Sequence, residues 1–150
     1  HEENNLEIRK ILKSDLEDLA RLMVEVFNTP PWNDTWTEET ASESLLSLID
    51  APGFYGNVMV EGTAIIGAIM GNKRLYSTET TYYLYEFFVS DKYRGKGVSK
   101  KLYEKTMSEL KKEGVSGAFF TTIRNSAAYK FYIKEGAWDL EDSACFYHKF

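Results

Sequence analysis

The chain has 150 residues, the size of one ordinary domain. Hydrophobic residues make up 43% and charged residues 27% of it, a composition that excludes disordered and collagen-like chains. The longest apolar run, residues 64–70, has the length of a strand and not of a membrane span. A single cysteine, Cys145, excludes an internal disulfide framework and a cysteine-built zinc site. We therefore predict one globular domain over residues 1–150, cytoplasmic, with residues 1–4 set apart as a tag remnant or disordered segment.

Charge is distributed unevenly along the chain. The total is 18 basic and 23 acidic residues, a balance that argues against general affinity for nucleic acid, because such binding depends on neutralising phosphates. No Lys or Arg occurs from Leu22 to Asn72, whereas basic residues crowd the stretch 92–105. Both stretches are compatible with ordinary solvated surfaces. The basic one is equally compatible with a site for one small phosphorylated ligand.

Periodicity and turn residues predict the elements in chain order. A short strand at 6–9 precedes two helices, at 14–27 and from Thr37 to 49, with a loop around Trp32 and Trp36 between them. Strands follow at 54–60, 63–74 and 80–89, and they are expected to pair antiparallel in sequence. The last third predicts a helix at 94–113, a strand at 115–122, a helix at 126–135 and a terminal strand at 145–150.

A glycine-rich turn leads from the third strand of this series into the helix at 94–113. Gly95 and Gly97 stand there with basic neighbours. A helix N-terminus offers backbone N–H groups and a positive dipole end, and glycine lets phosphate oxygens approach them closely. The spacing fits neither a Walker loop nor a dinucleotide fingerprint. Taken alone, the turn is equally compatible with a phosphate cradle and with a tight turn among surface lysines.

Two segments together resemble the GNAT superfamily of N-acetyltransferases. The stretch FVSDKYRGKGVSKKL (88–102) is similar to the acetyl-CoA-binding segment of that family, with Arg94, Gly97 and Ser99 at its pattern positions, although Gly or Ala is usual where Ser99 stands. The stretch NSAAYKFYIKEGA (125–137) is similar to the second segment of the family, with Ala137 where an aromatic residue often follows the glycine. The order of elements upstream is similar too, so the likeness covers almost the whole chain.

This resemblance implies a fold, a co-substrate and a set of binding residues. The fold is α/β (α+β): a mixed, mostly antiparallel central sheet flanked by helices, with a splayed strand pair that holds acetyl-CoA. Main-chain groups of Phe88 and Val89 would bind the pantetheine arm, and Asn125 would lie near it, unless Asn125 is instead a helix cap. The pyrophosphate would lie on the turn and the first helical residues, namely Arg94, Gly95, Lys96, Gly97, Val98 and Ser99.

Acetyl transfer to an amine requires a base for the nitrogen and an acid for the departing thiolate. Tyr132 matches the position of the frequent general acid of the family, and its alternative role is core packing. Glu86 lies in the middle of an aromatic strand and matches an acidic residue that many members carry there. Strand alternation predicts Leu84, Glu86 and Phe88 on one face, so burial would raise the pKa of Glu86 toward that of a useful base.

Neither a covalent cysteine route nor a metal site is expected. Cys145 and His148 would lie on opposite faces of the terminal strand, and two histidines cannot supply an ordinary His-based metal site. We therefore predict direct transfer in a ternary complex, with no metal and with the backbone N–H of Val89 polarising the thioester carbonyl.

The acceptor is inferred from the stretch without basic residues. Its carboxylates, together with Trp32 and Trp36, would suit a cationic amine such as an aminoglycoside or a polyamine. The alternatives are a peptide or protein amine (an N-terminus or a lysine), or a non-catalytic acetyl-CoA sensor. No membrane or nucleic-acid partner is expected, and the terminal strand would offer an edge for a homodimer.

Overall fold

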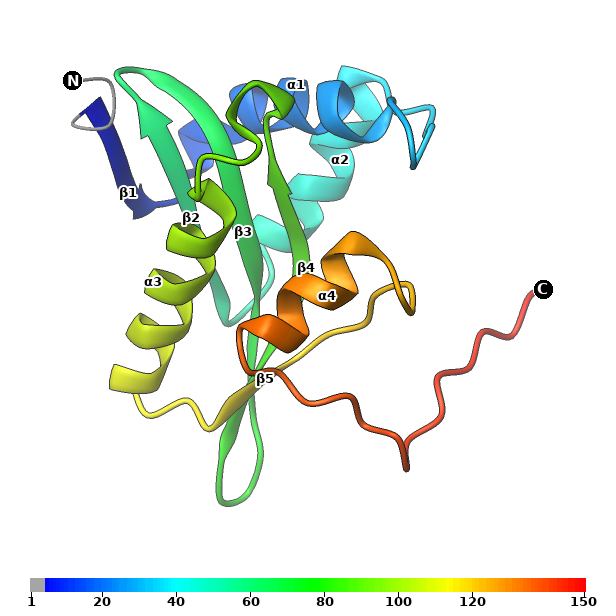
Figure 1. The fold of residues 1–150 in the computed structure, drawn as a ribbon. Helices are drawn as coiled ribbons and strands as arrows, with labels where there is room; N and C mark the ends of the chain where they lie inside the picture. The colour runs from blue at the N-terminus through cyan, green and yellow to red at the C-terminus, as the bar shows by residue number, and fades with distance from the viewer. Residues whose placement is uncertain (1–4) are drawn as a thin grey trace. The chain divides into compact units, whose positions relative to one another are not determined.

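The computed structural model describes residues 5–150, and the expected tag remnant at 1–4 lies outside them. The chain forms two compact units that adjoin in sequence between Phe120 and Thr121. The first unit contains the sheet and helices α1–α3 (Figure 1). Its elements are β1 (Leu6–Lys10), α1 (Leu16–Phe27), α2 (Glu38–Ile49), β2 (Phe54–Glu61), β3 (Ala64–Leu75), β4 (Thr80–Val89), α3 (Val98–Lys112) and β5 (Gly117–Phe119), with short 3-10 turns at Lys13–Asp15 and Asp91–Tyr93.

The sheet has the strand order β1-β2-β3-β4-β5. Strands β1 to β4 pair antiparallel with their neighbours, and β5 pairs parallel to β4. This confirms the mixed, mostly antiparallel sheet that the sequence predicts. The β4–β5 ladder joins only Thr81–Tyr83 to Gly117–Phe119. The rest of β4, up to Val89, continues beyond this ladder, whereas β5 ends at Phe119, so the splayed strand pair that the resemblance implies stays a prediction.

Two layers of side chains cover the sheet. On one face, α1 and α2 pack against β2, β3 and β4 through a continuous apolar core whose buried members include Leu19, Met23, Leu45, Val58, Ala68, Met70 and Phe88. On the other face lies α3, where the ring of Tyr103 stacks on that of Phe87 with centroids 6.1 Å apart. The amide of Asn57 also donates to the hydroxyl of Thr106 on α3, at 2.9 Å.

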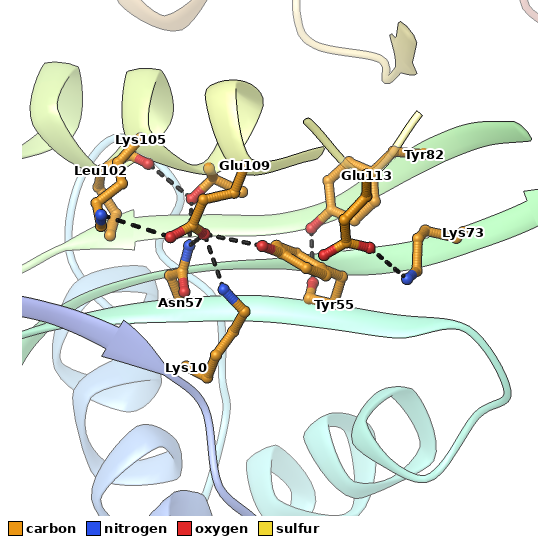
Figure 2. Close-up of polar contacts among 10 residues, drawn as sticks. Lys10, Tyr55, Asn57, Lys73, Tyr82, Leu102, Lys105, Glu109 and Glu113 are labelled. Carbon is orange, nitrogen blue, oxygen red and sulfur yellow. Dashed lines mark hydrogen bonds and ion pairs between the residues drawn. The ribbon is translucent and has the colours of Figure 1, made fainter. Parts of the chain in front are cut away.

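A carboxylate of α3 organises the polar part of this second layer (Figure 2). Glu109 Oε1 accepts hydrogen bonds from Lys10 Nζ at 2.9 Å, from Tyr55 Oη at 2.8 Å and from Asn57 Nδ2 at 2.8 Å. Desolvation raises the pKa of Glu109, but these three donors outweigh it and lower the pKa to about 2. The network ties β1 and β2 to α3 at a point far from the glycine-rich turn.

The interior of β4 contains a β-bulge that the sequence does not reveal. Met70 of β3 pairs with Glu86, while its neighbour Gly71 pairs with Leu84, so Tyr85 is the extra residue. Directly paired residues share a face, and consecutive residues of β3 do not. The prediction that Leu84 shares the face of Glu86 and Phe88 is therefore wrong. Leu84 faces α3, and Glu86 faces α1 and α2.

The second unit, residues 121–150, contains α4 (Ala127–Lys134). This helix begins at Ser126, whose hydroxyl accepts from the backbone N–H of Tyr129 at 3.1 Å, and the chain leaves it through Gly136 at φ +97°. The carboxylate of Asp139 accepts from the Tyr129 hydroxyl at 2.8 Å and pairs with Arg124.

The predicted terminal strand is wrong, because residues 145–150 form no strand. A strand exists only where a neighbour pairs with its backbone, and alternating apolar residues alone do not supply that neighbour. The expectation that this strand places Cys145 and His148 on opposite faces loses its basis with it.

Candidate active site

The glycine-rich turn joins β4 to α3 through two left-handed glycines. Gly95 has φ +74° and Gly97 has φ +76°, a region that other residues adopt only at a cost. Gly97 is the N-cap of α3, which begins at Val98 and not at the predicted residue 94. A Cβ added at either glycine would meet nothing within 4 Å. The turn is therefore open on the side where these Cβ atoms would stand, and it leads directly into the helix N-terminus, whose N–H groups favour an anion.

Charged and aromatic side chains surround the turn. The Arg94 guanidinium pairs with Asp91 at 2.5 Å and lies over the ring of Trp32, 5.6 Å from its centroid. The Lys96 ammonium lies 5.5 Å from the ring centroid of Tyr93. A surface pocket of about 580 Å³ adjoins the turn and is lined by Asn5, Glu61, Gly62, Lys92, Tyr93 and Lys96.

Glu86 lies on β4 at the bulge, three residues before the strand ends. Its side chain is partly buried on the face that carries Phe88. Burial raises the pKa of the Glu86 carboxyl to about 7, and the negative charge of Asp34 adds to the shift. A carboxyl with this pKa is half ionised near neutral pH, as a general base requires. The structure thus shows Glu86 partly buried on the face of Phe88, as alternation between these two residues predicts, and the bulge removes only Leu84 from that face.

The loop between α1 and α2 brings Asp34 and two tryptophans to this end of the sheet. The Asp34 backbone N–H donates to Phe27 O at 2.8 Å, and its carboxylate accepts from the Trp36 indole at 3.1 Å. The Asn28 side chain bonds both the N–H and the carbonyl of Trp36, at 2.9 and 2.8 Å. The sequence marks Asp34 only as one acidic residue among several. Its electrostatic contact with Glu86 is a product of the fold.

Asn125 and Tyr132 belong to the second unit. Asn125 is exposed and adopts φ +64°, which asparagine tolerates better than most residues. The helix-cap alternative for Asn125 is wrong, because Ser126 caps α4. Tyr132 lies on α4, partly buried, with its ring edge-on to that of Phe131 at 5.5 Å between centroids.

Neither the cysteine nor a metal cluster contributes a site. Cys145 is exposed outside any helix or strand. Among residues 5–150, no group of three or more His, Cys, Asp or Glu side chains is arranged to hold a metal ion. Within the same residues, no helix combines the length and the apolar character needed to cross a membrane.

The family model described as "Acetyltransferase (GNAT) family" matches residues 15–136. The chain belongs to this family. It is thus an acyltransferase of a family that uses acetyl-CoA, as the two sequence segments imply. The match extends over both the glycine-rich turn and α4, so every candidate site residue lies inside it. No curated protein sequence matches the chain.

Solved structures share the fold. An integron cassette protein from the mobile metagenome of V. cholerae has 19% identity and a TM-score of 0.82, covering 97% of this chain and 93% of the other. An aminoglycoside acetyltransferase from an uncultured soil metagenomic sample, in complex with sisomicin, has 23% identity and a TM-score of 0.77, covering 100% and 99%. The aminoglycoside N-acetyltransferase AAC(6')-Iy in complex with CoA has 19% identity and a TM-score of 0.74, covering 96% and 94%.

Proposed function

We propose that this acetyltransferase moves the acetyl group of acetyl-CoA to a primary amine of a small cationic acceptor, by direct attack in a ternary complex. The observation that carries the proposal is the carboxylate pair Glu86 and Asp34. Two carboxylates on adjoining elements favour a cation between or beside them, because the negative charge of Asp34 raises the free energy of ionising Glu86. An ammonium group relieves that repulsion and at the same time supplies the nitrogen that must lose a proton.

Glu86 is the proposed base. With a pKa of about 7, its carboxylate is basic enough to accept a proton from the ammonium, directly or through water. The free nitrogen then attacks the thioester carbonyl carbon, and the C–S bond breaks. Tyr132 is the proposed acid that protonates the departing thiolate, and the Val89 N–H polarises the carbonyl oxygen. The second proton of the attacking nitrogen passes through water to the resulting tyrosinate, which leaves a neutral amide and restores the phenol. The products are the acetylated amine and CoA.

The remaining site residues hold acetyl-CoA. Main-chain groups of Phe88 and Val89 bind the pantetheine arm along the part of β4 that β5 does not pair, and the resemblance assigns Asn125 to the same arm. The backbone of Arg94–Ser99 holds the pyrophosphate, with charge from Arg94 and Lys96. The open N-terminus of α3 and the two left-handed glycines support this assignment.

The cationic acceptor is supported by charge and by two neighbours. The loop that carries Asp34 also presents Trp32 and Trp36, whose rings suit ammonium groups. One structural neighbour is an aminoglycoside acetyltransferase in complex with sisomicin. Another is AAC(6')-Iy in complex with a bisubstrate analogue of CoA and acetylneamine. We therefore place polycationic aminoglycosides and polyamines first among the acceptors.

A thiol-release screen tests the proposal. Acetyl-CoA is offered with aminoglycosides, polyamines, amino acids and peptides bearing free N-termini or lysines, beside a thermal-shift titration with CoA. Release should concentrate among the polycations, and Asp34→Asn should raise their KM, whereas the control Glu79→Gln, an exposed carboxylate of the β3–β4 turn, should not. If only the peptides cause thiol release, the acceptor is a peptide or protein amine and not a small cation. CoA binding without any release would indicate a sensor.

A further inference from the structure

Four side chains form a continuous stack from β4 to the glycine-rich turn. The buried ring of Phe88 meets that of Phe27 edge-on, with centroids 5.6 Å apart. Phe27 meets Trp32 in the same manner at 5.1 Å, and the Arg94 guanidinium lies over the Trp32 ring. The stack therefore connects the strand proposed for pantetheine, the end of α1, the α1–α2 loop and the turn proposed for pyrophosphate.

Arg94 uses different parts of its guanidinium for its two contacts. Its Nε lies against Asp91, and the group as a whole lies over the Trp32 ring. A guanidinium is a planar fork that can lay its face on an aromatic ring while its N–H groups bind an oxyanion. A phosphate can therefore bind the other N–H groups of Arg94 without displacing it from Trp32, and this adds a contact to the one that Nε makes with Asp91.

The loop that carries Trp32 is the one that presents Asp34. The backbone bond from Asp34 N–H to Phe27 O and the bond from the Trp36 indole to the Asp34 carboxylate hold this carboxylate in place. Trp32 itself is 39% exposed. The ring of Phe27 and the guanidinium of Arg94 contact its indole and hold it in this orientation.

We infer that Trp32 is a positioning residue that couples CoA binding to the order of the acceptor loop, residues 28–36. This inference rests on the proposed function, because it takes the glycine-rich turn as the pyrophosphate site. With the diphosphate on the turn, Arg94 is held from both sides and Trp32 is held by Arg94. The loop that presents Asp34 to the acceptor is thereby ordered before the acceptor arrives. Conversely, an ordered loop strengthens the binding of CoA by the same factor.

Hydrogen exchange with and without CoA tests the coupling without knowledge of the acceptor. In the wild type, CoA should slow amide exchange in peptides that cover 94–101 and also in peptides that cover 28–36. In Trp32→Leu, CoA should still protect 94–101, but protection of 28–36 should be lost. Trp32→Tyr keeps an aromatic face for Arg94, so CoA should still give this variant most of the protection of 28–36. Trp138→Phe is the matched control, because Trp138 is 86% exposed in the second unit.

Affinity gives a second readout. A cation–π contact at an exposed site corresponds to about a two- to fivefold change in the Kd of CoA, so Trp32→Leu should weaken binding by that factor. Arg94→Gln should weaken it further, and adding Trp32→Leu to Arg94→Gln should have almost no additional effect.

The possible outcomes distinguish an error in the proposed coupling from an error in the proposed pyrophosphate site. If CoA protects 94–101 but not 28–36 in the wild type, or protects both regions equally in Trp32→Leu, the coupling is wrong and the cofactor site stands. If CoA protects neither region, the proposed pyrophosphate site is wrong, and the coupling falls with it.

Discussion

Leu84 and Glu86 lie on opposite faces of the sheet although only Tyr85 separates them in sequence. In a regular strand they would share a face. The bulge opposite Met70 inserts one extra residue between them, so Leu84 faces α3 while Glu86 stays with Phe88 on the face of α1 and α2. There the carboxyl joins Phe88 on the apolar face and comes under the influence of Asp34, which together raise its pKa to about 7. The proposed base therefore directly follows an irregularity in β4, which leaves its own face unchanged.

The pH dependence of the reaction should report Glu86. A base acts when deprotonated, so kcat/KM, which reports the pKa values of the free enzyme, should rise with pH through about 7. Glu86→Gln should remove this limb and lower kcat by about 10²- to 10⁴-fold, the usual contribution of a positioned proton acceptor. An unchanged pH profile in Glu86→Gln would show that Glu86 is not the general base.

Stability gives an independent check on the same carboxyl. A pKa raised from 4.5 to about 7 means that the folded state holds a proton that the unfolded state has lost, so ionisation of Glu86 costs stability as pH rises through this window. Glu86→Gln should therefore raise the Tm relative to wild type at pH 8 more than at pH 4.

Asp34→Asn should move the pH profile without abolishing the activity. Burial of Glu86 remains in this variant, but the negative charge that helps to raise its pKa is gone. The pKa of Glu86 should fall, and the rising part of the kcat/KM profile should shift to lower pH. Glu79→Gln serves as the control for removal of an exposed carboxylate. A shift to higher pH would contradict the electrostatic contact.

Gly71→Ala should destabilise the fold at the bulge. A Cβ at Gly71 would lie 2.0 Å from the backbone oxygen of Tyr83 and 2.9 Å from the ring of Tyr82. Backbone must move to admit it, so we expect a loss of about 1–3 kcal/mol in the free energy of unfolding, the range for overpacking. Gly117→Ala is the matched control on β5 of the same sheet, where an added Cβ meets nothing within 4 Å. Equal effects in chemical denaturation would count against this account of the bulge.

Tyr132→Phe should separate binding from turnover. The substitution keeps the ring and its contact with Phe131 but removes the hydroxyl that would protonate the thiolate. We expect CoA to bind with an unchanged Kd, while kcat in the thiol-release assay falls by about 10²-fold or more. Undiminished turnover would leave Tyr132 with a packing role.

Glu109→Gln should alter stability in acid. Glu109 has a folded-state pKa of about 2 against an ordinary value of 4.5, so its contribution is present above pH 4.5 and is lost as pH falls toward 2. The variant should be less stable than wild type at pH 7, by about 1–2 kcal/mol, because hydrogen bonds to a charged group are lost. Its Tm should also depend less on pH between 5 and 2, and a parallel dependence would contradict the network of Figure 2.

Local patterns in the sequence determined most of the elements and the family. Strand β4 has its predicted bounds, residues 80–89, because its aromatic residues and flanking turns are local signals. The glycines at 95 and 97 mark the turn because their left-handed conformation is a property of the residue itself. The two motif segments predict acetyl-CoA chemistry for the same reason: each is a contiguous stretch whose residues carry the resemblance.

Tertiary structure alone decided which side chains meet. The bulge next to Glu86 results from the pairing of β3 with β4, and no residue type in the sequence of β4 predicts it. The approach of Asp34 to Glu86 and the stack from Phe88 to Arg94 join segments more than fifty residues apart in the chain. The terminal strand expected at 145–150 is the reverse case. Its alternating pattern is present, but a strand also needs a partner edge, and a local pattern cannot specify one.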